Sequence, residues 1–209
     1  MYLSKLLLDP VSHQVQREVA NRYELHRTLT AQFPQEARQD INLLYRIELP
    51  DRQVYQPITL LVQTQIEPVW NALAESGLLT EQPQVKLFDP VIPDGRTFYF
   101  RLLGNPTVRR KQPDGSSKRV GLYTIEEQND WINRKAEQAG FQINAVKSTD
   151  QGMIESIKRK NGRTFNIKHL SVQFDGILLV TNPERFQNTL VKGIGSAKAF
   201  GFGLLSLAK

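Results

Sequence analysis

The chain has 209 residues, with 27 Lys and Arg against 21 Asp and Glu, so its formal net charge is +6. This length suits one medium domain or two small ones, and the charge is compatible with a polyanionic partner. Cysteine is absent, which excludes disulfides, cysteine-based zinc sites and a cysteine nucleophile. The first nine residues are too short and lack the basic start of a secretory signal, and no stretch approaches the length of a membrane span, so we expect a cytoplasmic protein.

The first ninety residues carry the pattern of a βαββαβ unit. A helical pattern covers residues 13–33 with a break near Asn21, where Asn21 and Glu24 fit a capping box. Beyond the break, Leu25, Leu29 and Phe33 recur on one face, which predicts the side packed on the core. Strands are expected at residues 2–8, 42–49, 59–66 and 84–88, with a second helix at residues 68–76.

After a turn-rich junction at residues 89–95, the same order of elements repeats. One helix begins at Thr124, where Glu127 completes a capping box, and another begins at Asn182, followed by Pro183. We therefore predict an α+β fold of two tandem ferredoxin-like domains, residues 1–90 and 95–209, the second enlarged by a hairpin. The expected strands of this half are residues 97–103, 141–147, 153–160, 163–174, 176–181 and 202–207.

A glycine-rich loop follows the last predicted helix and contains Lys198. The order of helix, loop and strand excludes a Walker loop, which opens a long helix, and a dinucleotide fingerprint, which needs a strand before it and a helix after it. Two interpretations remain. Either the loop N–H groups face phosphates with Lys198 as a nearby charge, or the loop is a helix C-cap and tight turn. Its glycines are Gly193, Gly195, Gly201 and Gly203.

Tyr23 and His26 lie three residues apart on one predicted helix, so their side chains share a face that is not the core face. With Arg27 they form a polar cluster near the helix start. Metal-free RNA cleavage requires a base for the 2′-hydroxyl, an acid for the leaving oxygen and cations for the phosphorane, and histidine suits either proton role. The alternative is a surface histidine on an amphipathic helix. His13 and His169 have no predicted partners.

A second basic group flanks an Asn161-Gly162 pair, the strongest short signal for a β-hairpin. With that turn, Lys160 would lie opposite Arg163, and such like-charge pairs are unfavourable unless a polyanion binds there. We therefore predict an RNA-binding hairpin, with a solvated hairpin tip as the alternative. The cations of this group are Lys158, Arg159, Lys160 and Arg163.

A third basic group is predicted to be a loop that either follows backbone phosphates or is a disordered surface loop. It contains Arg109, Arg110, Lys111, Lys118 and Arg119. The sequence shows no paired Asp or Glu motif with metal spacing, which disfavours two-metal nuclease chemistry, so we predict neither metal nor cofactor. It also lacks the RNP1 signature, which disfavours an ordinary pair of RNA-recognition motifs.

Residues 21–29 and the glycine-rich loop resemble the CasE family of the type I-E (Cascade) system, CRISPR-associated endoribonucleases of the RAMP superfamily. The resemblance covers nearly the whole chain and implies two tandem RAMP/RRM-like domains. It places Tyr23 and His26 at the active-site positions of the family, Arg27 at a basic position beside them, and the basic hairpin on the stem of the repeat RNA. Some members carry a lysine further along this helix. Ala31 and Gln32 stand in that region here, which leaves Lys160 and Lys198 as candidates for that role.

The resemblance implies a metal-independent endoribonuclease that binds the CRISPR repeat stem-loop. It would cleave precursor CRISPR RNA at the 3′ base of the hairpin by 2′-hydroxyl attack, leaving a 2′,3′-cyclic phosphate and a 5′-hydroxyl. It further implies that the protein stays on the guide RNA as a subunit of Cascade, with no membrane partner. The competing interpretation is a non-catalytic RAMP-type RNA-binding subunit. The pairing of Tyr23 with His26 favours the enzyme.

Overall fold

The structure, a computed structural model, describes residues 1–50, 56–160 and 162–208, and the side chains of Arg159 and Lys160 lie outside the described part. The chain forms two compact units. The first contains Met1–Pro90, Glu155–Ile167 and Lys198–Leu204, and the second contains Val91–Ile154, Lys168–Ala197 and the C-terminal strand. The domain boundary at residues 90–95 stays a prediction, and the segment Glu155–Ile167 of the basic hairpin groups with the first unit.

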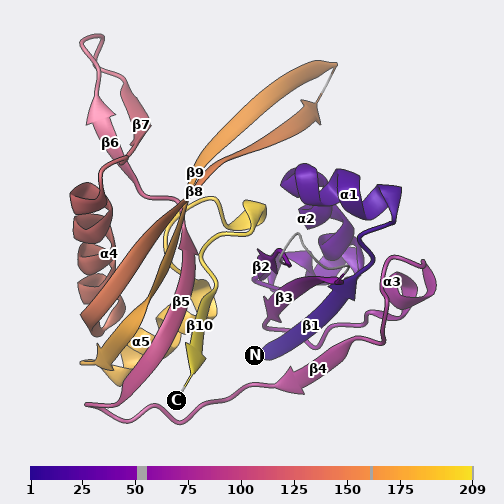
Figure 1. Cartoon of the computed structure of the whole chain (residues 1–209), viewed down its shortest axis with the longest axis horizontal. Coiled ribbons are helices and arrows are strands. Elements are labelled where there is room, and N and C mark those ends of the chain that lie inside the picture. The colour runs from indigo at the N-terminus through magenta and orange to yellow at the C-terminus, as the bar shows by residue number, and fades with distance from the viewer. Residues whose placement is uncertain (51–55, 161, 209) are drawn as a thin grey trace. The chain divides into compact units, whose positions relative to one another are not determined.

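A four-stranded antiparallel sheet with the order β2-β3-β1-β4 forms the first unit (Figure 1). This order, with helices between β1 and β2 and between β3 and β4, is that of a ferredoxin-like βαββαβ unit, which confirms the prediction for the first half. The four strands are β1 (Tyr2–Leu8), β2 (Leu44–Glu48), β3 (Ile58–Thr64) and β4 (Gln84–Leu87).

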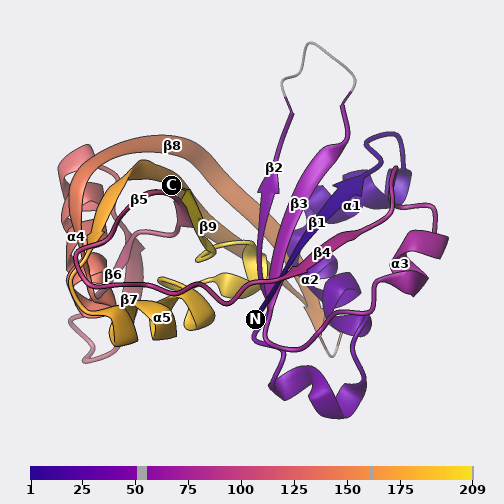
Figure 2. The same cartoon turned by 90° about the horizontal axis from the view of Figure 1, so that it is seen from below.

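Figure 2 shows helices beside this sheet. One of them packs on the sheet through the apolar face that the sequence predicts. Leu25, Leu29 and Phe33 are buried together with Leu6 and Leu60 of the central strands. The helix Arg22–Ala31 is therefore held in place by its core face. The helices of this unit are α1 (His13–Ala20), α2 (Arg22–Ala31), the 3-10 helix η1 (Gln35–Gln39) and α3 (Asn71–Glu75).

The second unit repeats this topology, with the sheet order β10-β5-β9-β8. The strands of this sheet are β5 (Thr97–Gly104), β8 (Phe141–Lys160), β9 (Arg163–Val180) and β10 (Leu205–Ala208), and the segment Glu155–Ile167 of β8 and β9 belongs to the first unit. The predicted breaks near residues 148–152 and at residue 175 are wrong, because β8 and β9 are continuous. Gly176 lies inside β9, where a Cβ would clash with the backbone oxygen of Ala145, so glycine is needed for close backbone approach.

The two helices of the second unit begin as the sequence predicts. The Thr124 hydroxyl accepts from the N–H of Glu127, whose carboxylate accepts from the N–H of Thr124, and the Asn182 side chain accepts from the N–H of Arg185. These helices, α4 (Ile125–Ala139) and α5 (Pro183–Lys192), cover an aromatic core that includes Trp131, Phe141, Phe174 and Phe186. Among the described helices, none is both long and apolar enough to cross a membrane.

The third basic group is a β-hairpin and not the predicted loop. Its strands, β6 (Thr107–Lys111) and β7 (Ser117–Gly121), pair antiparallel between β5 and α4. The register places Arg109 opposite Arg119 and Arg110 opposite Lys118, all exposed. Extended backbone keeps these like charges close together, at a cost that a bound polyanion would remove.

Candidate functional site

A pocket of about 450 Å³ lies along α2 in the first unit. Its lining includes Tyr23, His26 and Arg27, which the sequence placed on one helix face, and Arg38 from η1. The predicted polar cluster therefore opens into a cavity. Arg27 forms an ion pair with Glu24 at 2.9 Å on the exposed helix surface, a contact that contributes little to stability and leaves the guanidinium accessible.

His26 combines access to this pocket with a partly buried ring. The ring stacks on Tyr45 with centroids 6.3 Å apart, and Nδ1 is buried with no hydrogen-bond partner among the described residues. Burial lowers the pKa of His26 below its ordinary value, because desolvation penalises the imidazolium. The imidazole is therefore neutral near pH 7 and can accept a proton.

Tyr45, for which the sequence predicted no functional role, supports the site from the core side. Its hydroxyl lies 3.0 Å from the carbonyl oxygen of Arg22 and 3.1 Å from that of Ala199. Burial raises the pKa of Tyr45, so the hydroxyl stays protonated and acts as a donor. Tyr45 thereby links the start of α2 to the glycine-rich loop, while its ring supports His26.

The part of the glycine-rich loop in the first unit packs behind α2. It begins with the 3-10 helix η2 (Lys198–Phe200), and the Arg22 guanidinium donates to the carbonyl of Phe200 at 3.4 Å. Gly201 has φ +82°, and a Cβ there would lie 2.9 Å from Arg22 Nη1 and 3.0 Å from the Tyr45 ring. This segment therefore fits the tight-turn interpretation, and a phosphate contact by Lys198 stays a prediction.

The remaining loop glycines serve backbone geometry. Gly193 ends α5, where its N–H donates to the carbonyl of Thr189 at 2.7 Å, as the C-cap interpretation predicts. Gly195, Gly201 and Gly203 also have positive φ. The predicted last strand starts too early: residues 202–204 are buried without strand pairing, and β10 begins at Leu205.

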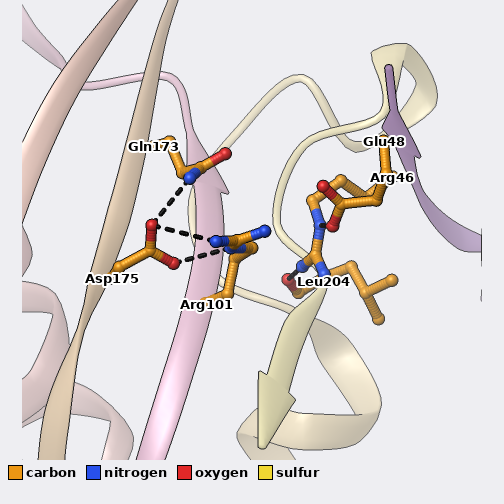
Figure 3. Close-up of polar contacts among 6 residues, drawn as sticks. All are labelled: Arg46, Glu48, Arg101, Gln173, Asp175 and Leu204. Atoms are coloured by element: carbon orange, nitrogen blue, oxygen red, sulfur yellow. Dashed lines mark hydrogen bonds and ion pairs between the residues drawn. The ribbon is translucent and has the colours of Figure 1, made fainter. Parts of the chain in front are cut away.

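A buried arginine also anchors the loop in the first unit. Arg46 is 3% exposed; its Nε lies 2.6 Å from a Glu48 carboxylate oxygen, and its Nη1 donates to the carbonyl of Leu204 at 3.2 Å (Figure 3). Strand alternation predicts opposite faces for Arg46 and Tyr45, and the structure buries both. A buried guanidinium of this kind requires its hydrogen-bond partners, so Arg46 ties β2 to the end of the loop.

Figure 3 also shows a separate polar group within the second unit. Arg101 on β5 pairs with Asp175 on β9 at 2.6 Å, and Gln173 donates to the same carboxylate at 2.6 Å. The Arg101 and Asp175 side chains are partly exposed, so we read this group as a cross-strand surface contact. The other histidines do not line the α2 pocket: His13 is exposed, and His169 contacts Asn105.

The basic hairpin brings Lys158 close to Tyr23. The Lys158 ammonium lies 5.3 Å from the centroid of the Tyr23 ring, within the range of a cation–π contact. Arg163 is exposed at the start of β9. The predictions for Arg159 and Lys160 side chains, and for Asn161 in the turn, lie outside the described residues.

The predicted capping box at Asn21 is wrong. The Asn21 side chain makes no cap bond; it donates to the carbonyl of Ile157 at 3.0 Å and accepts from the Ile157 N–H at 3.1 Å. Glu24, the other half of the expected box, pairs with Arg27. A contact between residues 136 positions apart carries no local sequence signal, which is why the capping pattern misled the prediction.

A sequence model of the family described as "CRISPR associated protein" matches residues 1–209. The chain belongs to this family. It is 38% identical over 220 residues to the CRISPR-associated endoribonuclease Cse3 of Thermus thermophilus, covering all of both chains. It is 29% identical over 216 residues to the CRISPR system Cascade subunit CasE of Escherichia coli, covering 100% of this chain and 99% of that protein. A solved structure of CRISPR endoribonuclease Cse3 bound to a 19-nucleotide RNA matches with TM-score 0.85 and 35% identity, covering all of both chains.

These relatives confirm the fold of two ferredoxin-like domains and the family resemblance. The lysine that some family members carry in this helix is still missing, because Ala31 and Gln32 occupy that region. The structure supplies two other cations near the site. Arg38 lines the pocket with its Nε donating to the carbonyl of Phe33, and Lys158 stands over Tyr23. Sequence reasoning missed Arg38 because the irregular turn into η1 has no periodic pattern.

Proposed function

We propose that this protein is a metal-independent endoribonuclease that binds the CRISPR repeat stem-loop and cleaves precursor CRISPR RNA at the 3′ base of the hairpin. The observation that carries the proposal is the pocket on α2, which Tyr23 and a neutral, partly buried His26 line together. The names of the relatives, an endoribonuclease and a Cascade subunit, support the same substrate and assembly.

In this mechanism His26 is the general base. Its lowered pKa favours the neutral imidazole, which removes the proton from the 2′-hydroxyl of the nucleotide at the cut. The resulting oxygen attacks the adjacent phosphorus, and the bond to the 5′-oxygen of the next nucleotide breaks. The protonated His26 then gives its proton to that leaving oxygen, directly or through the Tyr23 hydroxyl, so the products are a 2′,3′-cyclic phosphate and a 5′-hydroxyl.

Tyr23 and the surrounding cations act on the phosphate. The Tyr23 hydroxyl orients the phosphate or shares in proton transfer. Lys158, Arg27 and Arg38 supply positive charge for the dianionic phosphorane, which is stabilised most by cations already in place before the reaction. These groups together provide the acid, base and electrostatic functions that the reaction needs.

Two basic hairpins hold the RNA in this proposal. The tip of β8 and β9 contacts the stem, and β6 and β7 follow backbone phosphates through residues that include Arg109, Arg110 and Lys111. The protein stays on the cleaved guide RNA in the cytoplasm as a Cascade subunit. Cleavage of a repeat hairpin in excess EDTA tests the proposal, whereas tight binding with no cleavage under any condition would support the non-catalytic RNA-binding subunit.

Replacing Lys158, Lys160 and Arg163 together with alanine is expected to weaken binding to the repeat hairpin and to flatten its dependence on salt. Each lost phosphate contact should reduce the slope of log affinity against log salt by about 0.7 to 0.9, because fewer counterions are released. Fluorescence anisotropy at several salt concentrations measures both quantities. Thermal stability should hardly change, since the variant removes a cationic cluster from one hairpin.

The matched control replaces three exposed cations that we place outside the RNA surface: Lys86, Arg134 and Arg185. This variant loses the same net charge, so it separates local contacts from the general field of the protein. We expect this control variant to keep a nearly wild-type slope of log affinity against log salt. The role of the hairpin is contradicted if both triple variants bind equally well with equal slopes.

A further inference from the structure

Asn21 makes an unusual pair of hydrogen bonds with the backbone of the basic hairpin. Its amide nitrogen donates to the carbonyl of Ile157 at 3.0 Å, and its amide oxygen accepts from the N–H of the same residue at 3.1 Å. One side chain therefore satisfies both backbone groups of one residue. In an antiparallel sheet, a residue of the neighbouring strand bonds both the N–H and the carbonyl of the residue opposite it. Asn21 therefore takes the place of a neighbouring strand at the edge of β8.

This contact joins the two parts that the proposed function requires to act together. Asn21 immediately precedes α2, two residues before Tyr23 and five before His26. Ile157 immediately precedes Lys158, whose ammonium stands 5.3 Å from the centre of the Tyr23 ring. All these residues belong to the first compact unit. The Asn21 bonds thus fix the hairpin backbone one residue away from the cation over Tyr23.

Burial of Ile157 does not explain the attachment. The Ile157 side chain is 45% exposed, and a polar hollow lined by Arg17, Glu18, Asn21, Glu24 and Ile157 borders this junction. The contact is therefore polar and local, and its geometry depends on an amide that both donates and accepts. Serine favours the same cap position, but its shorter side chain carries one polar atom, whereas the paired bonds use two separate atoms of the Asn21 amide.

We infer that Asn21 is a positioning residue that fixes the RNA-binding hairpin of β8 and β9 relative to the catalytic helix α2. The inference rests on the proposed function. RNA held by the hairpin reaches His26 in a reactive geometry only when the hairpin is fixed to α2 at Ile157. Losing the Asn21 bonds should therefore impair cleavage of bound RNA more than binding itself, because small misplacements of reacting groups are costly.

The test compares Asn21→Ser and Asn21→Ala with the wild type in single-turnover cleavage of a repeat hairpin. Both variants should slow cleavage by about 10- to 100-fold at saturating protein, while the Kd for the hairpin changes less than about threefold. Ser12→Ala is the matched control, because Ser12 caps α1 through the N–H of Val15 and does not contact the hairpin. It should leave the cleavage rate unchanged. If Asn21→Ser cleaves at the wild-type rate, the paired bonds are unimportant and the inference is wrong.

Amide hydrogen exchange separates this inference from the proposed function. The Ile157 N–H should exchange at least about tenfold faster in Asn21→Ser than in the wild type, whether or not the protein cleaves RNA. Lys158→Ala combined with Asn21→Ser should slow cleavage less than the product of the single effects, because Asn21 acts in part by placing the Lys158 ammonium over Tyr23. Unchanged Ile157 exchange would contradict the attachment itself, whereas faster exchange in a protein that never cleaves would contradict only the proposed function.

Discussion

Replacing His26 with alanine is expected to slow single-turnover cleavage of the repeat hairpin by about 10²- to 10⁴-fold, the usual contribution of a general base. The structure supports this size of effect because His26 lines the pocket with Tyr23 and its burial keeps the imidazole neutral. Affinity for the RNA should stay nearly constant, since binding is assigned to the hairpins. Rapid-quench kinetics with protein in excess over RNA measures the rate directly.

Three further variants test whether the slower cleavage comes from the loss of the proton acceptor. His13→Ala removes an exposed histidine from the neighbouring helix α1 and should leave the rate unchanged. His26→Gln keeps a polar side chain that cannot take up a proton, so it should be nearly as slow as His26→Ala. Tyr23→Phe should have a smaller effect, because only the hydroxyl is lost. A wild-type rate in His26→Ala would remove His26 from the mechanism.

Gly201→Val is expected to destabilise the protein by about 2–5 kcal/mol, combining left-handed backbone strain for a β-branched residue with overpacking. Gly201 has φ +82°, and a Cβ there would meet the Arg22 guanidinium at 2.9 Å and the Tyr45 ring at 3.0 Å. The substitution should also slow cleavage, because the displaced groups support α2 and His26. Urea denaturation measures the change in the free energy of unfolding.

Gly115→Val is the matched control for backbone strain. Gly115 has φ +80°, yet no atom lies within 4 Å of the position of its Cβ, so only the conformational cost applies. We expect Gly201→Val to lower stability well beyond Gly115→Val, and Lys198→Ala to lower it less than Gly201→Val. Equal destabilisation by the two valine variants would show that the packing of Gly201 against Arg22 and Tyr45 is unimportant.

Local patterns predicted the elements whose signals lie within a few residues. The strand at residues 2–8 matches β1, and the capping residues Thr124 and Asn182 begin α4 and α5. The shared face of Tyr23 and His26 also follows from helical spacing alone, and the structure places both on one pocket. These features need only the period of a helix or strand and the chemistry of one cap.

Contacts between distant parts of the chain could not be predicted in this way. Asn21 is expected from the sequence to cap α2 through its side chain because asparagine favours the N-cap position. Its amide instead forms hydrogen bonds with the backbone N–H and carbonyl of Ile157. Tyr45 looks like an ordinary core residue of a strand, and only the fold brings its ring to His26. The predicted break at residue 175 is another case, because β9 continues through it and Gly176 allows the close approach to Ala145.

The most direct test of the proposed function is cleavage of a repeat hairpin in excess EDTA, with and without a 2′-deoxy substitution at the nucleotide that is cut. The mechanism predicts cleavage at an undiminished rate in EDTA, a 2′,3′-cyclic phosphate and a 5′-hydroxyl at the new ends, and no cleavage of the deoxy substrate, because the attacking oxygen is then absent. Cleavage that stops in EDTA and returns with Mg²⁺, or that proceeds on the 2′-deoxy substrate, would contradict it.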